Sequence, residues 1–224
     1  MPEPGEARIA VLVSGQGRNL QALIAACASR RIRGSIVGVL SNRAQAPALA
    51  RAHAAGIPAR TIAHADYPER AAFVAALSAA LDELRPDVIV LAGFMRVLGP
   101  AFVQGHAGRL LNVHPSLLPR HRGLHTHQRA LAAGDREHGA TVHFVTEELD
   151  GGPPVIQGRV SVRSQDTPDT LADRVMTEVE IRILPQTVAW MAEGHLALRG
   201  ACAELRGRVL TAPLQLADLD EAFR

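Results

Sequence analysis

The chain has 224 residues, of which 47% are hydrophobic and 21% are charged, and its formal net charge at pH 7 is +2. This composition fits a single globular domain with ample material for a core, and it excludes collagen-like and disordered chains. The small surplus of basic residues forms no dense cluster, so we expect no nucleic-acid partner.

The cysteine content and the length of the apolar runs indicate the cellular location of the protein. Cys27 and Cys202 are the only two cysteines, too few for a disulfide framework. Residues 1–8 lack the apolar segment of a signal peptide, and apolar runs such as 87–93 are too short to cross a bilayer. We therefore expect a cytoplasmic protein without a membrane partner, present as a monomer or homodimer.

Buried-strand patterns alternate with helical patterns through the first half of the chain. Strands are predicted at 8–13, 35–40, 59–62 and 87–91, and helices at 20–30, 47–55 and 68–84. This alternation predicts an α/β fold, with a Rossmann-like, doubly wound and mostly parallel sheet covered on both faces.

The second half is less regular. It contains a predicted helix at 100–106, a strand at 109–113, a helix at 124–133, strands at 141–145 and 155–162, and a long helix at 167–193. We expect antiparallel elements here. Residues after 200 have weak periodicity, so we interpret 1–200 as the functional domain and 201–224 as a loosely packed C-terminal tail.

Three stretches with polar residues or glycines follow predicted strands, at 14–19, 92–98 and 112–119. Open α/β sheets bind ligands outside the carboxyl ends of their strands. We therefore expect these three stretches to form one site.

Asn112 and His114 lie two positions apart in a predicted strand, so their side chains point to the same face. Pro115 ends the strand directly after them. An amide donor beside an imidazole can stabilise a developing oxyanion, which is what acyl transfer requires. The alternative for His114 is a purely structural histidine.

The segment Ser14-Gly-Gln-Gly-Arg-Asn19 joins a predicted strand to a predicted helix. Gly15 and Gly17 permit a tight turn, and free N–H groups at the helix start favour a phosphate. The third glycine of the dinucleotide pattern is missing, so a monophosphate is favoured over NAD, with Arg18 as an added positive charge. A plain strand-to-helix turn is the alternative.

Asp150 precedes two glycines and a proline, so it lies in a defined loop. A carboxylate there could orient His114 and favour its protonated form, and a protonated imidazole can also deliver a proton. The alternative is an Asp that only forms the turn. Residues 91–98 could pair main-chain groups with a flat heteroaromatic ring, or could simply pack in the core.

Seven of the ten histidines lie between positions 106 and 143, which suggests a zinc site. However, no cysteine lies nearby, and no His-x-x-x-His pair falls on a predicted helix. We therefore expect no metal.

Several motifs together resemble those of the phosphoribosylglycinamide formyltransferases and occur in the same order. They are Ser-Gly-x-Gly-x-Asn-Leu at 14–20, Leu-Ala-Gly-Phe-Met-Arg at 91–96, Asn-x-His-Pro-Ser-Leu-Leu-Pro at 112–119, His-Gly-Ala-Thr-Val-His-Phe-Val at 138–145 and Leu-Asp-Gly-Gly-Pro at 149–153. The resemblance covers about Ile9 to Leu198. It implies an enzyme of purine biosynthesis that transfers a formyl group from the co-substrate 10-formyltetrahydrofolate to glycinamide ribonucleotide.

The resemblance also implies roles for individual residues. The catalytic residues are Asn112, His114 and Asp150. The ribonucleotide site contains Gly17, Arg18, Asn19 and Glu180, although Glu178 fits the last role after a one-residue shift. The folate site contains Arg70, Met95, Arg96, Val97, Leu98 and Asn112.

The sequence departs from the family pattern in places. Arg18 stands where a small residue is common, and His121-Arg122 replaces an aromatic-Pro pair. The related formyltetrahydrofolate hydrolase and methionyl-tRNA formyltransferase carry additional domains, so the length of the chain favours neither. A non-catalytic folate- or nucleotide-binding module is the alternative from another class of protein.

Overall fold

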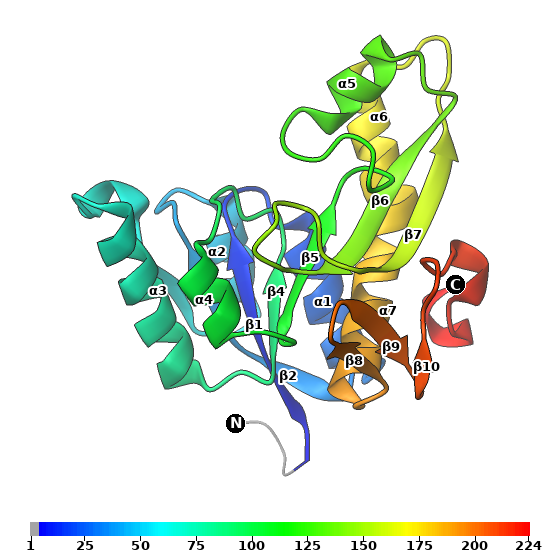
Figure 1. The fold of residues 1–224 in the computed structure, drawn as a ribbon. Helices are drawn as coiled ribbons and strands as arrows, with labels where there is room; N and C mark the ends of the chain where they lie inside the picture. The colour runs from blue at the N-terminus through cyan, green and yellow to red at the C-terminus, as the bar shows by residue number, and fades with distance from the viewer. Residues whose placement is uncertain (1–4) are drawn as a thin grey trace.

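The computed structural model describes residues 5–224, and a seven-stranded sheet runs through its centre (Figure 1). The strands are β1 (Ala7–Val13), β2 (Gly34–Ser41), β3 (Ala59–Thr61), β4 (Val88–Leu91), β5 (Leu110–His114), β6 (Glu137–Phe144) and β7 (Pro154–Ser161). Their order is β3-β2-β1-β4-β5-β6-β7. The first five are parallel to one another, whereas β6 runs antiparallel to both β5 and β7. This confirms the predicted α/β fold with antiparallel elements in the second half.

Helices cover both faces of the sheet. They are α1 (Arg18–Ala28), α2 (Pro47–Ala54), α3 (Arg70–Leu84), α4 (Pro100–Gly105), α5 (Thr126–Ala132), α6 (Pro168–Val175) and α7 (Ile181–Ala192), with a π-helical segment at Met176–Glu180 and short 3-10 turns at His64–Asp66, Leu216–Asp218 and Glu221–Phe223. In Figure 1, α3 and α4 lie on one side of the sheet and α1 and α7 on the other. The predicted helix at 167–193 is therefore correct in extent but contains a π turn.

The two faces of the sheet are distinguished by the alternation of side chains along each strand. In β1, Ile9, Val11 and Val13 belong to the cluster that includes residues of α1 and α7. The side chains between them, Ala10 and Leu12, belong to the cluster that includes residues of α3 and α4. All five are 0% exposed, as expected of a central parallel strand covered on both faces.

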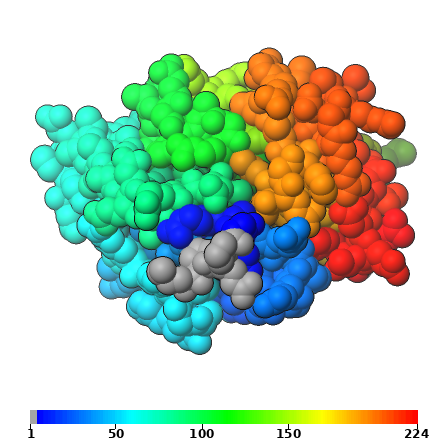
Figure 2. Space-filling model, turned by 90° about the horizontal axis from the view of Figure 1, so that it is seen from below, coloured from blue at the N-terminus to red at the C-terminus, as the bar shows by residue number. Residues whose placement is uncertain are grey.

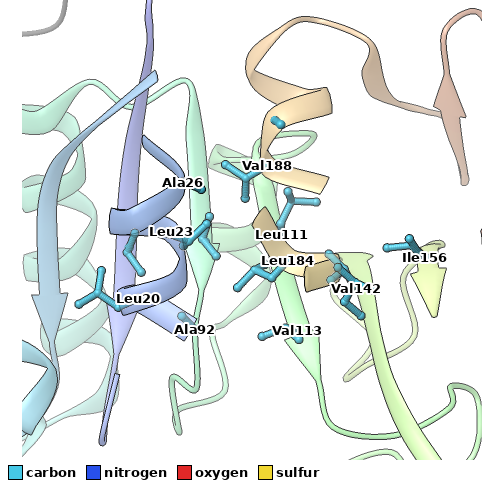
Figure 3. Packing of buried hydrophobic residues seen from close by; sticks show 14 of the residues in the cluster. Leu20, Leu23, Ala26, Ala92, Leu111, Val113, Val142, Ile156, Leu184 and Val188 are labelled. Atoms are coloured by element: carbon cyan, nitrogen blue, oxygen red, sulfur yellow. The ribbon is translucent and has the colours of Figure 1, made fainter. Parts of the chain in front are cut away.

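Strand β5 uses the same alternation to aim its polar residues. Leu111 and Val113 pack in the cluster beneath α1 and α7, near Leu184 (Figure 3). The alternate residues, Asn112 and His114, therefore point to the opposite face. The packing of β5 thus fixes the direction of the two side chains that the sequence singled out.

The carboxyl ends of β1 and β4 create the place where a ligand is expected. These strands are neighbours, but the chain leaves β1 towards β2 and returns to β4 after β3 and α3. Crevices at such points of reversal are the usual ligand sites of open α/β sheets. The glycine turn follows β1, and the loop at 92–99 follows β4.

The expectation of a loosely packed tail at 201–224 is wrong. Strands β8 (Leu196–Arg199), β9 (Cys202–Leu205) and β10 (Arg208–Val209) form a second, antiparallel sheet. Leu219 and Phe223 are buried in the main core, and Asp220 accepts a 2.8 Å hydrogen bond from Trp190 Nε1. Figure 2 shows the orange and red C-terminal residues as part of the continuous surface. The division of the chain at residue 200 stays a prediction.

Within residues 5–224, none of the helices combines the length and the apolar character needed to cross a membrane.

Candidate active site

The glycine turn brings the start of α1 against α2. Gly17 has a φ of +74°, and a Cβ there would lie 2.7 Å from the Cβ of Ala48, so both the conformation and the contact require glycine. Gly17 is also the N-cap of α1 and offers no side chain to the first-turn N–H groups, and that turn holds no acidic residue. The start of α1 thus has the open amides and positive dipole that suit an anion.

Asn19 and Glu180 meet inside the protein beside this turn. The Asn19 amide donates a 2.6 Å hydrogen bond to Glu180 Oε2, and both residues are 5% exposed. Burial raises the pKa of the Glu180 carboxyl. Glu178 instead has an exposed side chain that pairs with Arg174, so of the two candidates only Glu180 reaches the turn.

The π segment explains why Glu180 points inwards. A π turn places one more residue in a helical turn than an α turn does, which rotates the residues that follow it. Here the segment ends at Glu180, and the side chains of Val179 and Glu180 are buried. Local departures of this kind occur often at functional sites.

Ser14 connects the glycine turn to the loop after β4. Its hydroxyl donates to Asn42 Oδ1 at 2.5 Å and accepts from the main-chain N–H of Met95 at 2.8 Å. Ser14 is 3% exposed. One buried hydroxyl therefore fixes the beginnings of the two predicted ligand-binding stretches relative to each other.

Several of the predicted folate residues lie on the exposed part of the loop after β4. Met95 and Val97 are 57% and 55% exposed. Two large apolar side chains, two positions apart in the chain, therefore face solvent, and exposed apolar groups of this kind can mark a ligand-binding surface. Leu98 is buried, and Arg96 is exposed. Arg70, at the start of α3, donates a 2.7 Å hydrogen bond to the carbonyl of Val97, so the structure brings this arginine to the same loop.

Asn112 is oriented by a neighbour on β6. Asn112 and His143 are paired across the antiparallel strands, and Asn112 Nδ2 lies 3.1 Å from His143 Nε2. The other ring nitrogen, Nδ1, lies 2.9 Å from the carbonyl of Phe144, which can only accept, so Nδ1 carries the proton. Burial lowers the pKa of His143 to about 4. His143 is therefore neutral near pH 7, and its Nε2 accepts from Asn112.

His114 is held at both ring nitrogens. Nε2 donates to the carbonyl of His121 at 3.0 Å, and because a carbonyl can only accept, Nε2 keeps its proton. Nδ1 lies 3.4 Å from Asp150 Oδ2. Nδ1 is therefore the ring nitrogen that faces a carboxylate.

Asp150 is held by the backbone conformation of its own loop and by a hydrogen bond from the loop that contains Gly123. Its φ is +49°, a region that few residues other than glycine adopt, and Oδ2 accepts a 2.8 Å hydrogen bond from the N–H of Gly123. The other oxygen lies 3.8 Å from His143 Nε2. The structure thus brings Asn112, His114 and Asp150 to one place, as the sequence predicted.

Two residues that shape the candidate site, His143 and Ser14, were not among the predicted site residues. His143 was part of a recognised motif, and the signal that could have identified it was its position opposite Asn112, which requires the strand register. Ser14 opened the glycine turn, but its two hydrogen bonds depend on Asn42 and Met95, which are distant in sequence.

The many histidines do not form a metal site in the part of the chain that the structure describes. Among residues 5–224, no group of three or more His, Cys, Asp or Glu side chains is arranged to hold a metal ion.

A doubly wound sheet that gathers an amide, an imidazole and a carboxylate near the carboxyl ends of its parallel strands has the architecture of an α/β enzyme, and such a set of groups can support acid–base and oxyanion chemistry. The chain belongs to the formyl transferase family, whose model matches residues 7–188.

Individual relatives cover nearly the whole chain. A phosphoribosylglycinamide formyltransferase from Escherichia coli K12 is 50% identical over 202 residues, which are 90% of this chain and 95% of the relative. One from Haemophilus influenzae is 45% identical over 203 residues, or 91% and 95% of the two chains. A solved phosphoribosylglycinamide formyltransferase from Coxiella burnetii superposes with a TM-score of 0.87 at 46% identity, and the match covers 93% of this chain and 99% of that chain.

Proposed function

We propose that this chain transfers the formyl group of 10-formyltetrahydrofolate to the amine of glycinamide ribonucleotide in purine biosynthesis. The observation that carries the proposal is the placement of His114 Nδ1 at 3.4 Å from Asp150, on the same strand face as Asn112. The relatives named above, 45% and 50% identical to this chain, support the choice of substrates.

In the proposed reaction, the uncharged amine attacks the formyl carbon, and the carbonyl electron pair moves to oxygen. One N–H of the Asn112 amide is engaged by His143, which leaves the second N–H for the oxyanion. Protonated Nδ1 of His114 is the other donor. Two preorganised donors in a largely buried site can stabilise a developing oxyanion by several kcal/mol.

Collapse of the tetrahedral intermediate breaks the bond between the formyl carbon and N10 of the folate. The attacking nitrogen must lose a proton and N10 must gain one. Asp150 faces Nδ1 of His114, and a protonated imidazole there can deliver a proton to the leaving nitrogen. The carboxylate can also receive the proton of the amine through water, and transfer of this proton to Nδ1 of His114 restores the starting charges of both groups.

Substrate binding follows from the two turns that Ser14 connects. The phosphate of the ribonucleotide would bind the N–H groups at Gly17, Arg18 and Asn19, with the Arg18 side chain as a cation. Glu180 would accept from hydroxyl or amine donors of the same substrate. The oxygen Oδ1 of Asn19 is buried and has no hydrogen-bond partner in the described structure, which supports a donor from the substrate there.

The folate would bind along the loop after β4. The exposed side chains of Met95 and Val97 would cover its ring system, and Arg70, Arg96 and Leu98 would complete this wall. We further propose that residues 1–200 contain all of this machinery. A cytoplasmic location and a monomer or homodimer remain predictions from the sequence.

A formyl-transfer assay tests the proposal. The purified chain is incubated with 10-formyltetrahydrofolate and one of three acceptors: glycinamide ribonucleotide, methionyl-tRNA or water alone. We expect N-formylated ribonucleotide and tetrahydrofolate in equal amounts, with little hydrolysis. Formylation of methionyl-tRNA, or tetrahydrofolate release that does not depend on the ribonucleotide, would contradict the proposal. Folate binding without any turnover would indicate the non-catalytic module.

A further inference from the structure

An ion pair joins the glycine turn to a helix from the far end of the sequence. Arg18 Nη1 lies 2.8 Å from Asp173 Oδ1, although 155 positions separate the two residues. The Arg18 side chain is 41% exposed and the Asp173 side chain 69%. Arg18 is the first residue of α1, and Asp173 lies on α6, so the pair bridges two elements at the proposed phosphate site.

The position of Arg18 makes a negative partner favourable. A cation at the start of a helix lies at the positive end of the helix dipole. The first turn of α1 has no acidic residue, and its N-cap, Gly17, has no side chain to offer. Asp173 is therefore the carboxylate that the structure places against this positive charge.

The neighbouring charges on α6 have other partners. Arg174 donates to both oxygens of Asp166 at 3.0 and 3.1 Å and lies 3.7 Å from Glu178. Among the described residues, Asp173 forms no hydrogen bond or ion pair with the side chain of Arg174. It pairs with Arg18 instead. The pairing is thus selective.

A phosphate that binds at the start of α1 competes with Asp173. The guanidinium of Arg18 can either exchange the carboxylate for the phosphate or share its donors between them. In both cases the Asp173 carboxylate competes with the phosphate for the positive charge of Arg18, and this competition weakens phosphate binding. Removal of the Asp173 charge should then strengthen phosphate binding, while Arg18 is needed for the effect.

We propose that Asp173 is a specificity-determining residue that pairs with Arg18 and thereby sets the affinity for the phosphate of the substrate. This inference rests on the proposed function, because it takes the ribonucleotide phosphate as the ligand of Arg18. Asp173 lowers the affinity for phosphate monoesters in general, so a substrate must supply further contacts, such as those with Asn19 and Glu180, to bind well.

The test is a double-mutant cycle with steady-state kinetics. In Asp173→Asn, we expect KM for glycinamide ribonucleotide to fall about two- to fivefold, the size of an exposed charge pair, with kcat unchanged. Arg18→Gln should raise KM. Asp173→Asn should have no further effect on KM in the Arg18→Gln background. The effect of Asp173→Asn should also shrink as salt rises.

A matched control removes a different charge from the same helix. Asp169 is exposed and lies one turn before Asp173, and we expect Asp169→Asn to leave KM unchanged. A KM for Asp173→Asn that equals or exceeds that of the wild type would overturn the inference. So would an equal fall in KM with and without Arg18, or an equal fall in the Asp169→Asn control.

A binding measurement separates this inference from the proposed function. Inorganic phosphate is titrated into the same proteins by calorimetry, which needs no turnover. Tighter phosphate binding by Asp173→Asn, lost in the Arg18→Gln background, supports the inference even if the wild type does not formylate the ribonucleotide. Formylation by the wild type with no change of phosphate affinity or KM in Asp173→Asn would overturn the inference and leave the proposed function intact.

Discussion

The Asn19 amide donates a 2.6 Å hydrogen bond to the buried carboxyl of Glu180, across 161 positions of sequence. Burial raises the pKa of this carboxyl, whereas the Asn19 hydrogen bond and the positive charge of Arg18 oppose that effect. The proposed ribonucleotide site therefore holds a carboxyl that ionises less readily in the folded protein than in the unfolded chain. Ionisation there should be linked to the stability of the fold.

The sign of that linkage can be measured with Glu180→Gln. Above the unfolded-state pKa of Glu, about 4.3, the unfolded wild type loses its proton before the folded protein does. The unfolding free energy of the wild type therefore falls as pH rises through the window up to the raised folded pKa of Glu180. Gln does not titrate, so the variant should gain stability relative to the wild type over the same window. Urea unfolding at several pH values checks this, and a relative loss would contradict it.

The same substitution should weaken substrate binding. A hydrogen bond to a charged group contributes about 1.5–3 kcal/mol, so Glu180→Gln should raise KM for glycinamide ribonucleotide about tenfold or more with a smaller effect on kcat. Glu178→Gln is the matched control, because its side chain is 53% exposed and pairs with Arg174. An equal rise of KM in both variants would show that Glu180 has no particular role.

Much of the fold could be predicted from the sequence because its central strands have strong local patterns. The apolar run at 87–91 and the alternating pattern before Pro115 can each be read from a few consecutive residues. Both segments are strands in the structure, β4 and β5. The strands after residue 195 are short and depend on pairing with one another. Their pattern alone therefore indicated a tail.

In the candidate site too, features set by neighbouring residues in the sequence could be predicted, whereas features set by contacts between distant segments could not. Asn112 and His114 were predicted together because a strand alternates with period two. His143 was missed as a site residue because its place opposite Asn112 depends on the register of β5 and β6. The choice between Glu178 and Glu180 could not be made because a single π turn changes which of them faces inwards.

Loss of either proposed oxyanion donor should slow the reaction and leave the fold intact. Removal of one such donor typically raises the barrier by about 3–4 kcal/mol, so Asn112→Ala or His114→Ala should lower kcat about a hundredfold or more. Thermal unfolding and circular dichroism of the variants serve as the check on folding. Turnover close to that of the wild type in a folded variant would refute the assignment.

His143 should act through Asn112. His143→Phe removes the acceptor for Asn112 Nδ2, and a neutral hydrogen bond contributes about 0.5–1.5 kcal/mol. We expect kcat to fall about three- to tenfold while KM for the folate changes less. His143→Gln keeps an acceptor, so it should recover part of the loss. A glutamine variant as slow as the phenylalanine variant would argue for a packing role alone.

Glycine is required at position 17 but not at position 15. In Gly17→Ala, the new Cβ would lie 2.7 Å from the Cβ of Ala48 at a φ of +74°. Left-handed strain and overpacking together predict a loss of about 2–4 kcal/mol in unfolding free energy. Gly15→Ala is the control, because a Cβ there has no atom within 4 Å among the described neighbours. Equal losses in the two variants, by urea unfolding, would contradict this account.

Acid sensitivity should come in part from His138, which is 1% exposed and has its Nε2 at 3.1 Å from His127 Nδ1. Burial, and then the charges of the neighbouring His127 and His121, lower the pKa of His138 to about 4. An unfolded histidine titrates near about 6.5. The stabilisation from this site is thus complete above about pH 6.5 and is lost as pH falls towards about 4.

His138→Gln should therefore flatten the dependence of stability on pH in that window. One titrating site contributes up to about 1.4 kcal/mol per pH unit, so the slope of unfolding free energy against pH should decrease by that amount or less between about pH 6.5 and about 4. His143, whose pKa is also lowered to about 4, remains in the variant and keeps part of the slope. Urea unfolding across this range makes the comparison, and the slopes of variant and wild type should coincide above about pH 7, where the neutral form dominates in both states. A variant that loses stability in acid as steeply as the wild type would show that His138 is protonated in the folded protein.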